Sequence, residues 1–584
     1  MAATVFCERL TAMRLLRLAL ARKPAFYGTK SIAARALERL LATCGVSTDI
    51  RKLDFGDVEI APHIRRRAYE TAERYLDRLH IRAWADDVSG ILSIDCELIA
   101  RKFFFDELYL KYEFLEIALR YALEHPDETH VMYADRQFLE PYHEQIEAQF
   151  TVRQIARLGP LGFVTILLLP LFLRYLWRRD GIDEKAVFHN QIVCEIDSEK
   201  IYEMFDNLFQ SCPSRAFVIE RRNIGEFSEA RRRELHITSL GLTREDYLFL
   251  RAAVYRYIGC CMRHYGDVSR YGGQLFGIFY TFVLGRAETI RGTDNRFVTH
   301  EHLFTTKAVR NEFLRTAGNT SIFVPMNAHA SPQFFHSEIF INYDVMCAAG
   351  KHTEDLYRKR RAVTRTFPPT GSYDNHRRTT WVHDKAERIA RLNAFKGDAI
   401  AVTIVSPGIC DPTYSHELKL MKLARELSKE EGVKVIIRTK PWPPLPKYAA
   451  FYETQTAGHE SILLTGSDYE LFDFPEVTDL FVTSISNAAC DMALCDGQVM
   501  FVDYMQDPDL FLYWSVIGEA LLTEEGAFAA IMAWVRDAGS GYARLTLRKH
   551  MEKLTSYLGY RFPSFDAYRA NLLRQLHLEA ACSA

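Results

Sequence analysis

The stretch from Asp479 to Tyr504 constrains the fold more than any other, because two strand patterns and a helix pattern follow one another closely in it. Leu480–Thr483 is a short apolar run of β-prone residues, and Val499–Asp503 is a second buried-strand pattern. Ala488–Leu494 lies between them, is rich in helix-forming residues and is followed by the stop signal Asp496-Gly497. Strand, helix and strand in this order predict a β-α-β unit with parallel strands.

Polar side chains lie between the first of these strands and the helix. Ser484, Ser486 and Asn487 are residue types that cap a helix by accepting hydrogen bonds from its first free N–H groups. Those N–H groups stand at the positive end of the helix dipole, which suits a phosphate. Asp491 follows one turn later on the face of Asn487, and a carboxylate there suits the hydroxyls of a nucleotide ribose. An ordinary β-α-β unit with a well-capped helix explains the same residues, so this stretch alone leaves both interpretations open.

Length and composition narrow the class of protein. At 584 residues the chain is too long for one hydrophobic core, so two or more domains are expected. The formal net charge of −2 provides no general electrostatic basis for binding nucleic acid. The 12 cysteines form no CxxC pair and no regular His/Cys spacing, which favours a reduced cytosolic compartment.

The strand–helix alternation extends over the C-terminal part of the chain. Ala399–Val405, Val433–Arg438 and Ser461–Leu464 have strand patterns, and His416–Lys429 is an amphipathic helix. Strands that alternate with helices at this spacing predict a parallel, doubly wound α/β sheet.

A turn-rich stretch, Pro368–His376, indicates a hinge before this part of the chain. We therefore expect an α/β protein with two Rossmann-like domains. The expected boundaries are 1–390 for the first domain, with a helical and apolar insertion at about 54–185, 391–540 for the nucleotide-binding domain, and 541–584 for helices that pack back on the first domain.

The most hydrophobic segment is Leu158–Leu173, which carries no charge. It is shorter than the roughly 20 residues that a membrane-spanning helix needs. Arg174, Arg178 and Arg179 follow it, with Tyr175 and Trp177 among them. Aromatic and cationic residues beside a short apolar segment predict contact with an anionic membrane surface through residues 158–179. A buried core helix is the alternative.

Three motifs in the second half of the chain resemble a known family. They are VIIRTKPWP (Val435–Pro443), SISNAACDMAL followed by GQVMFVDY, and FINYDVMCAAGKHTEDLY followed by TGSYD. With them the chain resembles the GT-B glycosyltransferases that build bacterial capsules and surface polysaccharides, including CDP-glycerol glycerophosphotransferase-like proteins. The likeness extends from about residue 320 to 510. Lys440 stands where that group usually has histidine, Asp491 where glutamate is commoner, and GSYD replaces a Gly-Asn-Pro run.

The resemblance implies a nucleotide-sugar donor bound at the carboxyl ends of the second domain's strands. The residues implied are Ser406, Gly408, Arg438, Lys440, Ser484, Ser486, Asn487 and Asp491. Arg438 or Lys440 would neutralise the leaving phosphate without a metal ion or other cofactor. A surface charge at a strand end is the alternative for Arg438.

Histidines and acids elsewhere offer further chemistry. His329 ends a first-domain strand that should face the cleft, and histidine titrates near neutrality, so it is the candidate general base. A structural loop histidine is the alternative. His300-Glu301-His302 has metal-like residue types but no third ligand at suitable spacing, and Asp507-Pro508-Asp509 reads as a proline turn more than as a metal-binding Asp-x-Asp motif.

The expected function is a metal-independent glycosyltransferase that moves a sugar from a nucleotide-sugar to a growing surface polysaccharide or lipid-linked acceptor. We expect it in the cytoplasm, peripheral or monotopic on the inner membrane. CDP-alditol phosphotransfer, sugar-nucleotide epimerisation and a catalytically silent membrane-associated assembly protein remain alternatives.

Overall fold

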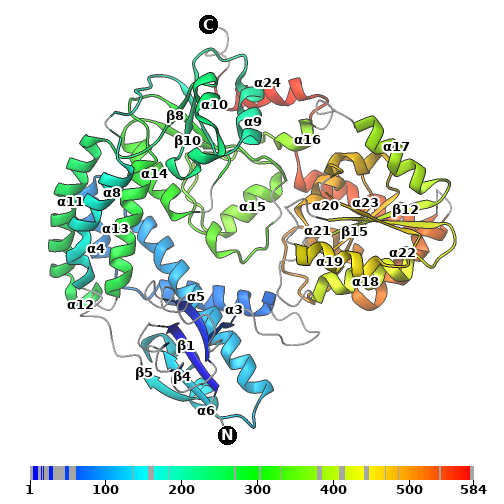
Figure 1. The fold of residues 1–584 in the computed structure, drawn as a ribbon, viewed down its shortest axis with the longest axis horizontal. Coiled ribbons are helices and arrows are strands. Elements are labelled where there is room, and N and C mark those ends of the chain that lie inside the picture. Colours follow the sequence, from blue (N-terminus) through cyan, green and yellow to red (C-terminus); the bar gives the residue numbers. More distant parts are fainter. Residues whose placement is uncertain are drawn as a thin grey trace.

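The computed structural model contains three parallel β-sheets surrounded by helices, so the fold is α/β (Figure 1). The residues it describes are 4–10, 15, 18, 25–30, 47–50, 61–134, 136–154, 164–182, 184–268, 271–301, 304–328, 331–377, 385–406, 415–439, 446–466, 468–484, 486–537 and 541–578.

The first sheet has five strands in the order β3-β2-β1-β4-β5, all parallel. The strands are β1 (Thr4–Leu10), β2 (Ala25–Lys30), β3 (Ser47–Asp49), β4 (His130–Ala134) and β5 (Thr151–Gln154). The helices of this part are α3 (Ala61–Leu76), α4 (Arg82–Leu92), α5 (Glu97–Glu124), the 3-10 helix η2 (Arg136–Tyr142) and α6 (His143–Gln149). Helix α5 carries buried residues on every side, because it packs against both the first sheet and a neighbouring layer of helices.

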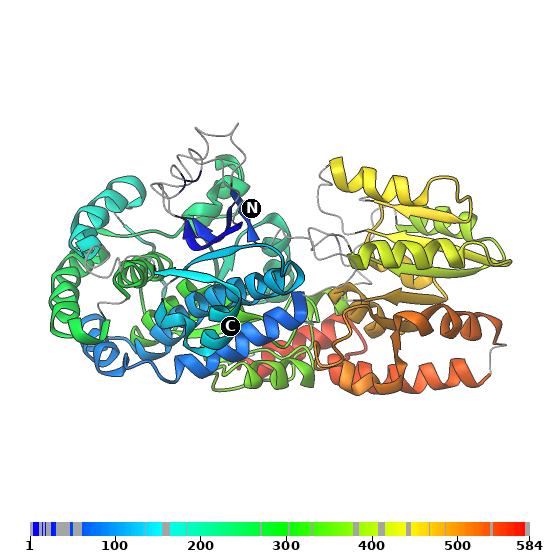
Figure 2. The same ribbon diagram turned by 90° about the horizontal axis from the view of Figure 1, so that it is seen from below.

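That helical layer lies at one side of the molecule (Figures 1 and 2). Its helices, besides α4, are η3 (Thr165–Leu168), α8 (Leu169–Asp180), α11 (Arg244–Arg263), α12 (Tyr265–Val268) and α13 (Gly272–Ala287). Helix α11 begins at a reciprocal cap, in which the Thr243 hydroxyl and the Asp246 carboxylate each accept a hydrogen bond from the other's N–H group. One large core joins this layer to α3 and α5.

The second sheet has six parallel strands in the order β11-β10-β9-β6-β7-β8. They are β6 (Ile192–Ile196), β7 (Arg215–Ile219), β8 (Ile237–Ser239), β9 (Arg296–Thr299), β10 (Thr320–Phe323) and β11 (Val345–Met346). The associated helices are α9 (Glu199–Phe209), η4 (Arg221–Glu226), α10 (Glu229–Glu234), α14 (Thr305–Thr316), η6 (His336–Glu338), α15 (Lys351–Lys359) and α16 (Tyr373–Arg377).

The third sheet also has six parallel strands, in the order β14-β13-β12-β15-β16-β17. They are β12 (Ile400–Val405), β13 (Val433–Arg438), β14 (Ile462–Thr465), β15 (Leu480–Thr483), β16 (Val499–Asp503) and β17 (Leu521–Thr523). Helices flank it as α17 (Lys385–Lys396), α18 (Ser415–Leu427), α19 (Pro446–Thr456), η7 (Leu471–Glu476), α20 (Asn487–Leu494), α21 (Trp514–Ile517), η8 (Gly518–Ala520) and α22 (Glu524–Arg536). Strands such as β12, with sequence IAVTIV, are almost fully buried because helices cover both faces of the sheet.

Each sheet together with its flanking helices is called a unit below. The last two described helices pack on different units. Helix α23 (Tyr542–Leu558) contributes Leu547, Met551 and Leu554 to the core of the third sheet. Helix α24 (Phe565–Gln575) instead places Tyr568 and Leu572 in the core of the second sheet. The C-terminal segment therefore crosses from one unit to the other (Figure 1).

Numbered within each unit, the strands of all three sheets follow the order 3-2-1-4-5, and the second and third sheets add a sixth strand beside the fifth. This is the Rossmann-type order, whose direction reverses between the first and fourth strands. In the second sheet that switch lies between β6 and β9, and in the third between β12 and β15.

The number of sheets differs from the sequence-based expectation. The described residues within 1–390, for which we expected one Rossmann-like domain, form two separate sheets. Each strand is a local pattern, but which strands pair is decided by contacts between residues far apart in the chain.

The apolar segment is amphipathic where it is described, from Val164 onward. Ile166, Leu169 and Leu173 are buried against the helical layer, whereas Leu167 and Leu171 are 54% and 66% exposed. Within the described part of the chain, every helix is too short or too polar to traverse a bilayer.

Candidate functional site

The carboxyl ends of β12, β13 and β15 bring three of the expected residues to one edge of the third sheet. Arg438 is the last residue of β13, and Ser406 and Ser484 directly follow β12 and β15. The register aligns Ile404 with Val482, so Ser406 and Ser484 continue side by side across the switch point. Open α/β sheets bind ligands at this place.

The two serines differ in their hydrogen bonds. The Ser406 hydroxyl is buried and bonds the Glu417 carboxylate at 2.7 Å and the Tyr452 hydroxyl at 2.8 Å. The Ser484 hydroxyl is also buried but has no hydrogen-bond partner among the described residues. A buried polar group without a partner is costly, and natural sites that keep one commonly use it to bind a ligand or water.

Arg438 brings a buried positive charge to the same edge. It is only 9% exposed, and within the described ranges no group accepts a hydrogen bond or ion pair from its guanidinium. Burial lowers the pKa of Arg438 to about 10, while the charge of Asp491 acts in the opposite direction. A buried cation and a hydroxyl without a described partner, both at one sheet edge, suit an anionic ligand such as a phosphate.

Helix α20 starts at this edge, but its first residues are not capped as the sequence suggested. Ser486 occupies the N-cap position, yet its side chain accepts no capping hydrogen bond. Asn487 is the first helical residue and is exposed. The first N–H groups of the helix therefore lack a side-chain acceptor from the N-cap residue.

Asp491 is placed differently from the two residues at the helix start. It is 3% exposed, and its Oδ1 accepts a hydrogen bond from the N–H of Ala328 at 3.2 Å. Ala328 follows β10, so this bond joins the third unit to the second. Burial raises the pKa of Asp491 to about 8, and the negative charge of Asp374 acts in the same direction. The loop after β10 covers Asp491, so ribose binding by this residue stays a prediction.

The carboxyl edge of the second sheet faces that of the third sheet. A histidine and an aspartate there form a pair that was not expected from the sequence. His300 follows β9 and Asp197 follows β6, the two strands at that sheet's switch point. His300 Nε2 lies 3.2 Å from Asp197 Oδ2, and its Nδ1 has no partner among the described residues. Although burial opposes ionisation of Asp197, its hydrogen bond and attraction to His300 lower its pKa. In the sequence, His300 was considered only as a possible metal ligand. Its position directly after a strand was the available signal for another role.

Lys200 connects this edge to the neighbourhood of Asp491. It lies in the first turn of α9, three residues after Asp197, and its Nζ is 3.6 Å from the carboxylate of Asp374. Both Lys200 and Asp374 act electrostatically on Asp491. The carboxyl edges of the second and third sheets therefore lie together.

A buried charge network lies behind the His300 pair. The carboxylates of Glu195, Glu220 and Glu288 lie within 4.8 Å of one another, a spacing that would suit a metal ion. The Lys307 ammonium contacts all three, at 2.8 Å from Glu195 and 3.6 Å from Glu288. The Lys307 ammonium thus occupies the place that a metal cation would take between these carboxylates.

The Asp507/Asp509 motif forms ion pairs with an arginine. Arg66 of α3 donates to Asp507 at 3.1 Å and to Asp509 at 3.2 Å. The remaining expected residues, Gly408, Lys440 and His329, lie outside the described residues.

The fold and site together define an α/β protein with Rossmann-type parallel sheets. Its candidate site is polar and lies where the carboxyl edges of the second and third sheets meet. No protein-family model matches the sequence, and no curated protein matches it.

Solved structures resemble the chain in part. The N-terminal domain of trehalose-6-phosphate phosphatase from Candida albicans has a TM-score of 0.40 at 9% identity, covering 68% of this chain and 100% of that chain. The wall teichoic acid polymerase TagF has a TM-score of 0.37 at 11% identity, covering 73% and 97%. The S. aureus protein MnaA, in a structure with UDP, has a TM-score of 0.38 at 9% identity, covering 67% and 98%. Scores this low assign no family, so the site rests on its own geometry.

Proposed function

We propose that the chain is a GT-B glycosyltransferase that moves a sugar from a nucleotide-sugar to a surface polysaccharide or lipid-linked acceptor. The observation that carries this proposal is a pair of buried polar groups at the carboxyl edge of the third sheet. The Ser484 hydroxyl lies at the switch point without a hydrogen-bond partner among the described residues, and the Arg438 guanidinium lies buried at the end of the nearby strand β13.

In this proposal the third unit binds the donor. Arg438, together with Lys440, neutralises the leaving phosphate, so that no metal ion is required. Ser484 and the free N–H groups at the start of α20 hold phosphate oxygens. Ser406, Gly408, Ser486 and Asn487 complete the donor site, and Asp491 binds the ribose only after the loop at Ala328 has moved away.

The second unit supplies the base that accepts a proton from the acceptor hydroxyl. His329 is the base proposed from the sequence, and it directly follows Ala328, whose N–H bonds Asp491. His300 is a second candidate, because Asp197 holds one ring nitrogen at 3.2 Å and leaves the other free of described partners. An imidazole oriented by a carboxylate is well suited to general-base catalysis.

We also propose that residues 158–179 rest on the cytoplasmic face of the inner membrane. Val164, Leu167, Leu168, Leu171 and Tyr175 are all more than half exposed. Arg174, Arg178 and Arg179 are exposed in the same helix. An apolar face bordered by arginines favours anionic lipid, where apolar side chains leave water and cations lie near the headgroups.

A thermal-shift screen with UDP, GDP, CMP, CDP and dTDP tests the donor site, because a ligand of the native state raises the melting temperature. At least one nucleotide should stabilise the protein, with or without EDTA. Arg438→Gln should weaken its binding tenfold or more, as expected when a charged hydrogen-bond donor is lost. The matched control is Arg425→Gln, because Arg425 donates to the Gln455 carbonyl at 3.2 Å within the same unit.

Stabilisation by no nucleotide would favour the catalytically silent assembly protein. If a nucleotide binds, product analysis with the matching activated donors separates sugar transfer from alditol-phosphate transfer and from epimerisation. Loss of activity on chelation, restored by magnesium, would contradict the metal-independent mechanism.

A further inference from the structure

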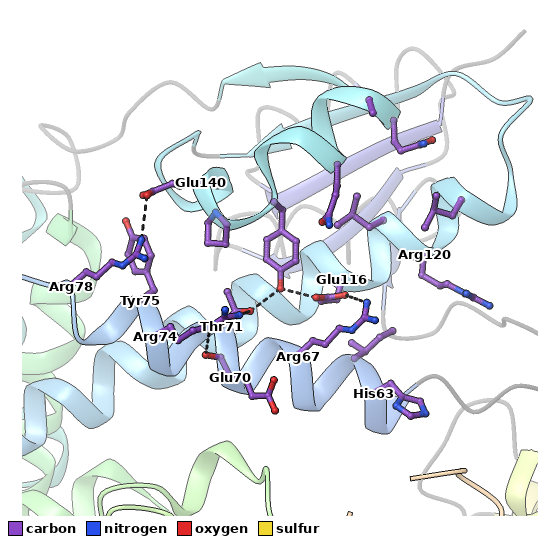
Figure 3. Close-up of a pocket in the computed structure, with 18 residues that line it drawn as sticks. His63, Arg67, Glu70, Thr71, Arg74, Tyr75, Arg78, Glu116, Arg120 and Glu140 are labelled. Carbon is purple, nitrogen blue, oxygen red and sulfur yellow. Dashed lines mark hydrogen bonds and ion pairs between the residues drawn. The ribbon is translucent and has the colours of Figure 1, made fainter. Parts of the chain in front are cut away.

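A cavity of about 1160 Å³ lies in the N-terminal part of the chain, away from the donor site (Figure 3). We call it the α3–α6 groove, because α3, the second half of α5, and η2 with α6 line it. Its volume is somewhat larger than that of ordinary ligand pockets, so it has room for more than one sugar unit.

The floor of the groove is a fixed polar chain. The Tyr142 hydroxyl donates to Glu116 Oε1 at 2.7 Å and lies 3.1 Å from the Thr71 hydroxyl. Arg67 approaches the other Glu116 oxygen at 3.7 Å. Figure 3 shows Thr71, Glu116 and Arg67 meeting between the helices. These groups, and the Gln145 amide beside them, offer the donors and acceptors that sugar hydroxyls use.

One wall of the groove carries a basic stripe along α3. His63, Arg67, Arg74 and Arg78 all line the groove and are exposed. Arg78 lies just after α3, which ends at Leu76. At 1.5 Å per residue the helical part of the stripe, from His63 to Arg74, is about 16 Å long, so an elongated ligand fits it better than a compact one.

The carboxylates of the groove are already paired, but one of its arginines is not. The pairs are Glu116 with Arg67 at 3.7 Å, Glu140 with Arg78 at 3.3 Å, and Glu70 with Arg66 at 3.3 Å. Among the described residues Arg74 bonds only neutral oxygens, the Glu70 carbonyl and the Thr71 hydroxyl, each at 3.3 Å. Its guanidinium is therefore available to an anionic group, which it can bind in a bidentate manner.

From this arrangement we propose that the α3–α6 groove binds an anionic oligosaccharide, with Arg74 and Arg67 holding its charged groups and the Tyr142–Glu116 floor binding its hydroxyls. The proposal rests on the proposed function, because it makes the groove the place where the acceptor glycan is held.

The position of the groove agrees with such a role. Arg66, next to Arg67 on α3, also forms ion pairs with Asp507 and Asp509, which follow β16 of the third sheet. The His63 end of the groove therefore lies beside the unit that carries the proposed donor site. A glycan bound along the stripe would have one end directed toward that unit.

Binding of a labelled tetragalacturonate to the full-length protein, followed by fluorescence anisotropy, tests the proposal. Its methyl ester has the same sugar backbone without the charges. The acid should bind at least tenfold more tightly than the ester, and added salt should reduce the difference. The double variant Arg67→Gln/Arg74→Gln should lose tenfold or more of the affinity for the acid.

Arg82→Gln is the matched control, because Arg82 is an exposed arginine of α4 outside the groove and contacts only Glu97, at 3.7 Å, among the described residues. It should bind as the parent does. Equal binding of acid and ester, no binding of the acid, or full affinity in the double variant would each overturn the proposal. Nucleotide stabilisation measured on the same proteins separates the two hypotheses. If nucleotides bind and the acid does not, only the groove proposal fails. If the acid binds and no nucleotide does, only the donor-site proposal fails.

Discussion

The carboxylate of Asp491 accepts a hydrogen bond from the backbone N–H of Ala328 at 3.2 Å, across the junction of the second and third sheet units. Asp491 is buried at this junction, and the nearby Asp374 carboxylate makes its ionisation still less favourable. A residue expected to face a ligand thus takes part in docking one unit on the other.

This burial predicts a pH-dependent stability. The pKa of Asp491 is about 8 in the folded protein against an ordinary value of 3.8, so between these pH values the unfolded chain releases a proton that the folded chain keeps. The contribution of Asp491 to the free energy of unfolding is therefore full below about pH 4 and falls as pH rises toward 8. Asp491→Asn cannot ionise and keeps an oxygen for the Ala328 N–H. It should be at least about 1 kcal/mol more stable than the parent at pH 8.

Denaturant unfolding of parent and variant at pH 5 and pH 8 measures this effect. Asp496→Asn serves as the control, because Asp496 is exposed and its neighbour Arg561 is also partly exposed. A variant whose advantage is the same at both pH values would show that Asp491 is ionised in the folded protein.

Removing the hydroxyl of Ser484 and removing that of its neighbour Thr483 should have opposite effects on stability and on nucleotide affinity. Ser484→Ala removes a buried hydroxyl without a described partner, so stability should be unchanged or slightly higher, while nucleotide affinity should fall roughly fivefold to tenfold. Thr483 donates to the Val405 carbonyl at 2.7 Å, so Thr483→Val should cost about 1–2 kcal/mol of stability and leave nucleotide affinity unchanged. Melting temperature and nucleotide titration of both variants check this. Undiminished nucleotide binding by Ser484→Ala would move the donor site away from the switch point.

The His300–Asp197 pair predicts a defect in turnover rather than in donor binding. His300→Gln should lower kcat by about 10²–10⁴-fold, the usual contribution of a general base, with nucleotide affinity retained. Asp197→Asn should lower kcat less, because the imidazole remains but loses its orienting charge. A pH–rate profile completes the measurement. The parent should lose activity as the base is protonated at low pH, and His300→Gln should lack that limb. An unchanged profile in the variant would assign the base to another residue, with His329 next to be tested.

Membrane contact predicts that the two faces of η3–α8 behave differently. Leu167→Asp/Leu171→Asp places charges on the exposed face and should reduce binding to vesicles with anionic lipid tenfold or more at an unchanged melting temperature. Leu169 is buried against the helical layer, so Leu169→Asp should instead unfold the protein. Leu545→Asp, at an exposed position on α23, is the matched control and should bind vesicles normally. Equal vesicle binding by the double variant and the parent would contradict the membrane proposal.

Much of the third unit could be predicted from the sequence. Val433–Arg438, Leu480–Thr483 and Val499–Asp503 are strands with the predicted bounds, and Ile400–Val405 begins one residue later than expected. Parallel strands covered on both faces are continuous apolar runs, so their positions and their polar ends are local properties of the sequence. Ser406, Arg438 and Ser484 could be placed at one edge for that reason.

Tertiary structure decided the rest. The strands of residues 1–390 are local patterns too, but their division into two sheets depends on pairing between distant segments. The same holds for the burial of Asp491 under Ala328 and for the meeting of His300 with Asp197. Periodicity reports whether a side chain faces a core or solvent, and it carries no information about which remote segment supplies the partner. The sequence by itself therefore determined the elements and the sheet edge, whereas the folded chain determined which charged groups at that edge are paired and which remain available to a ligand.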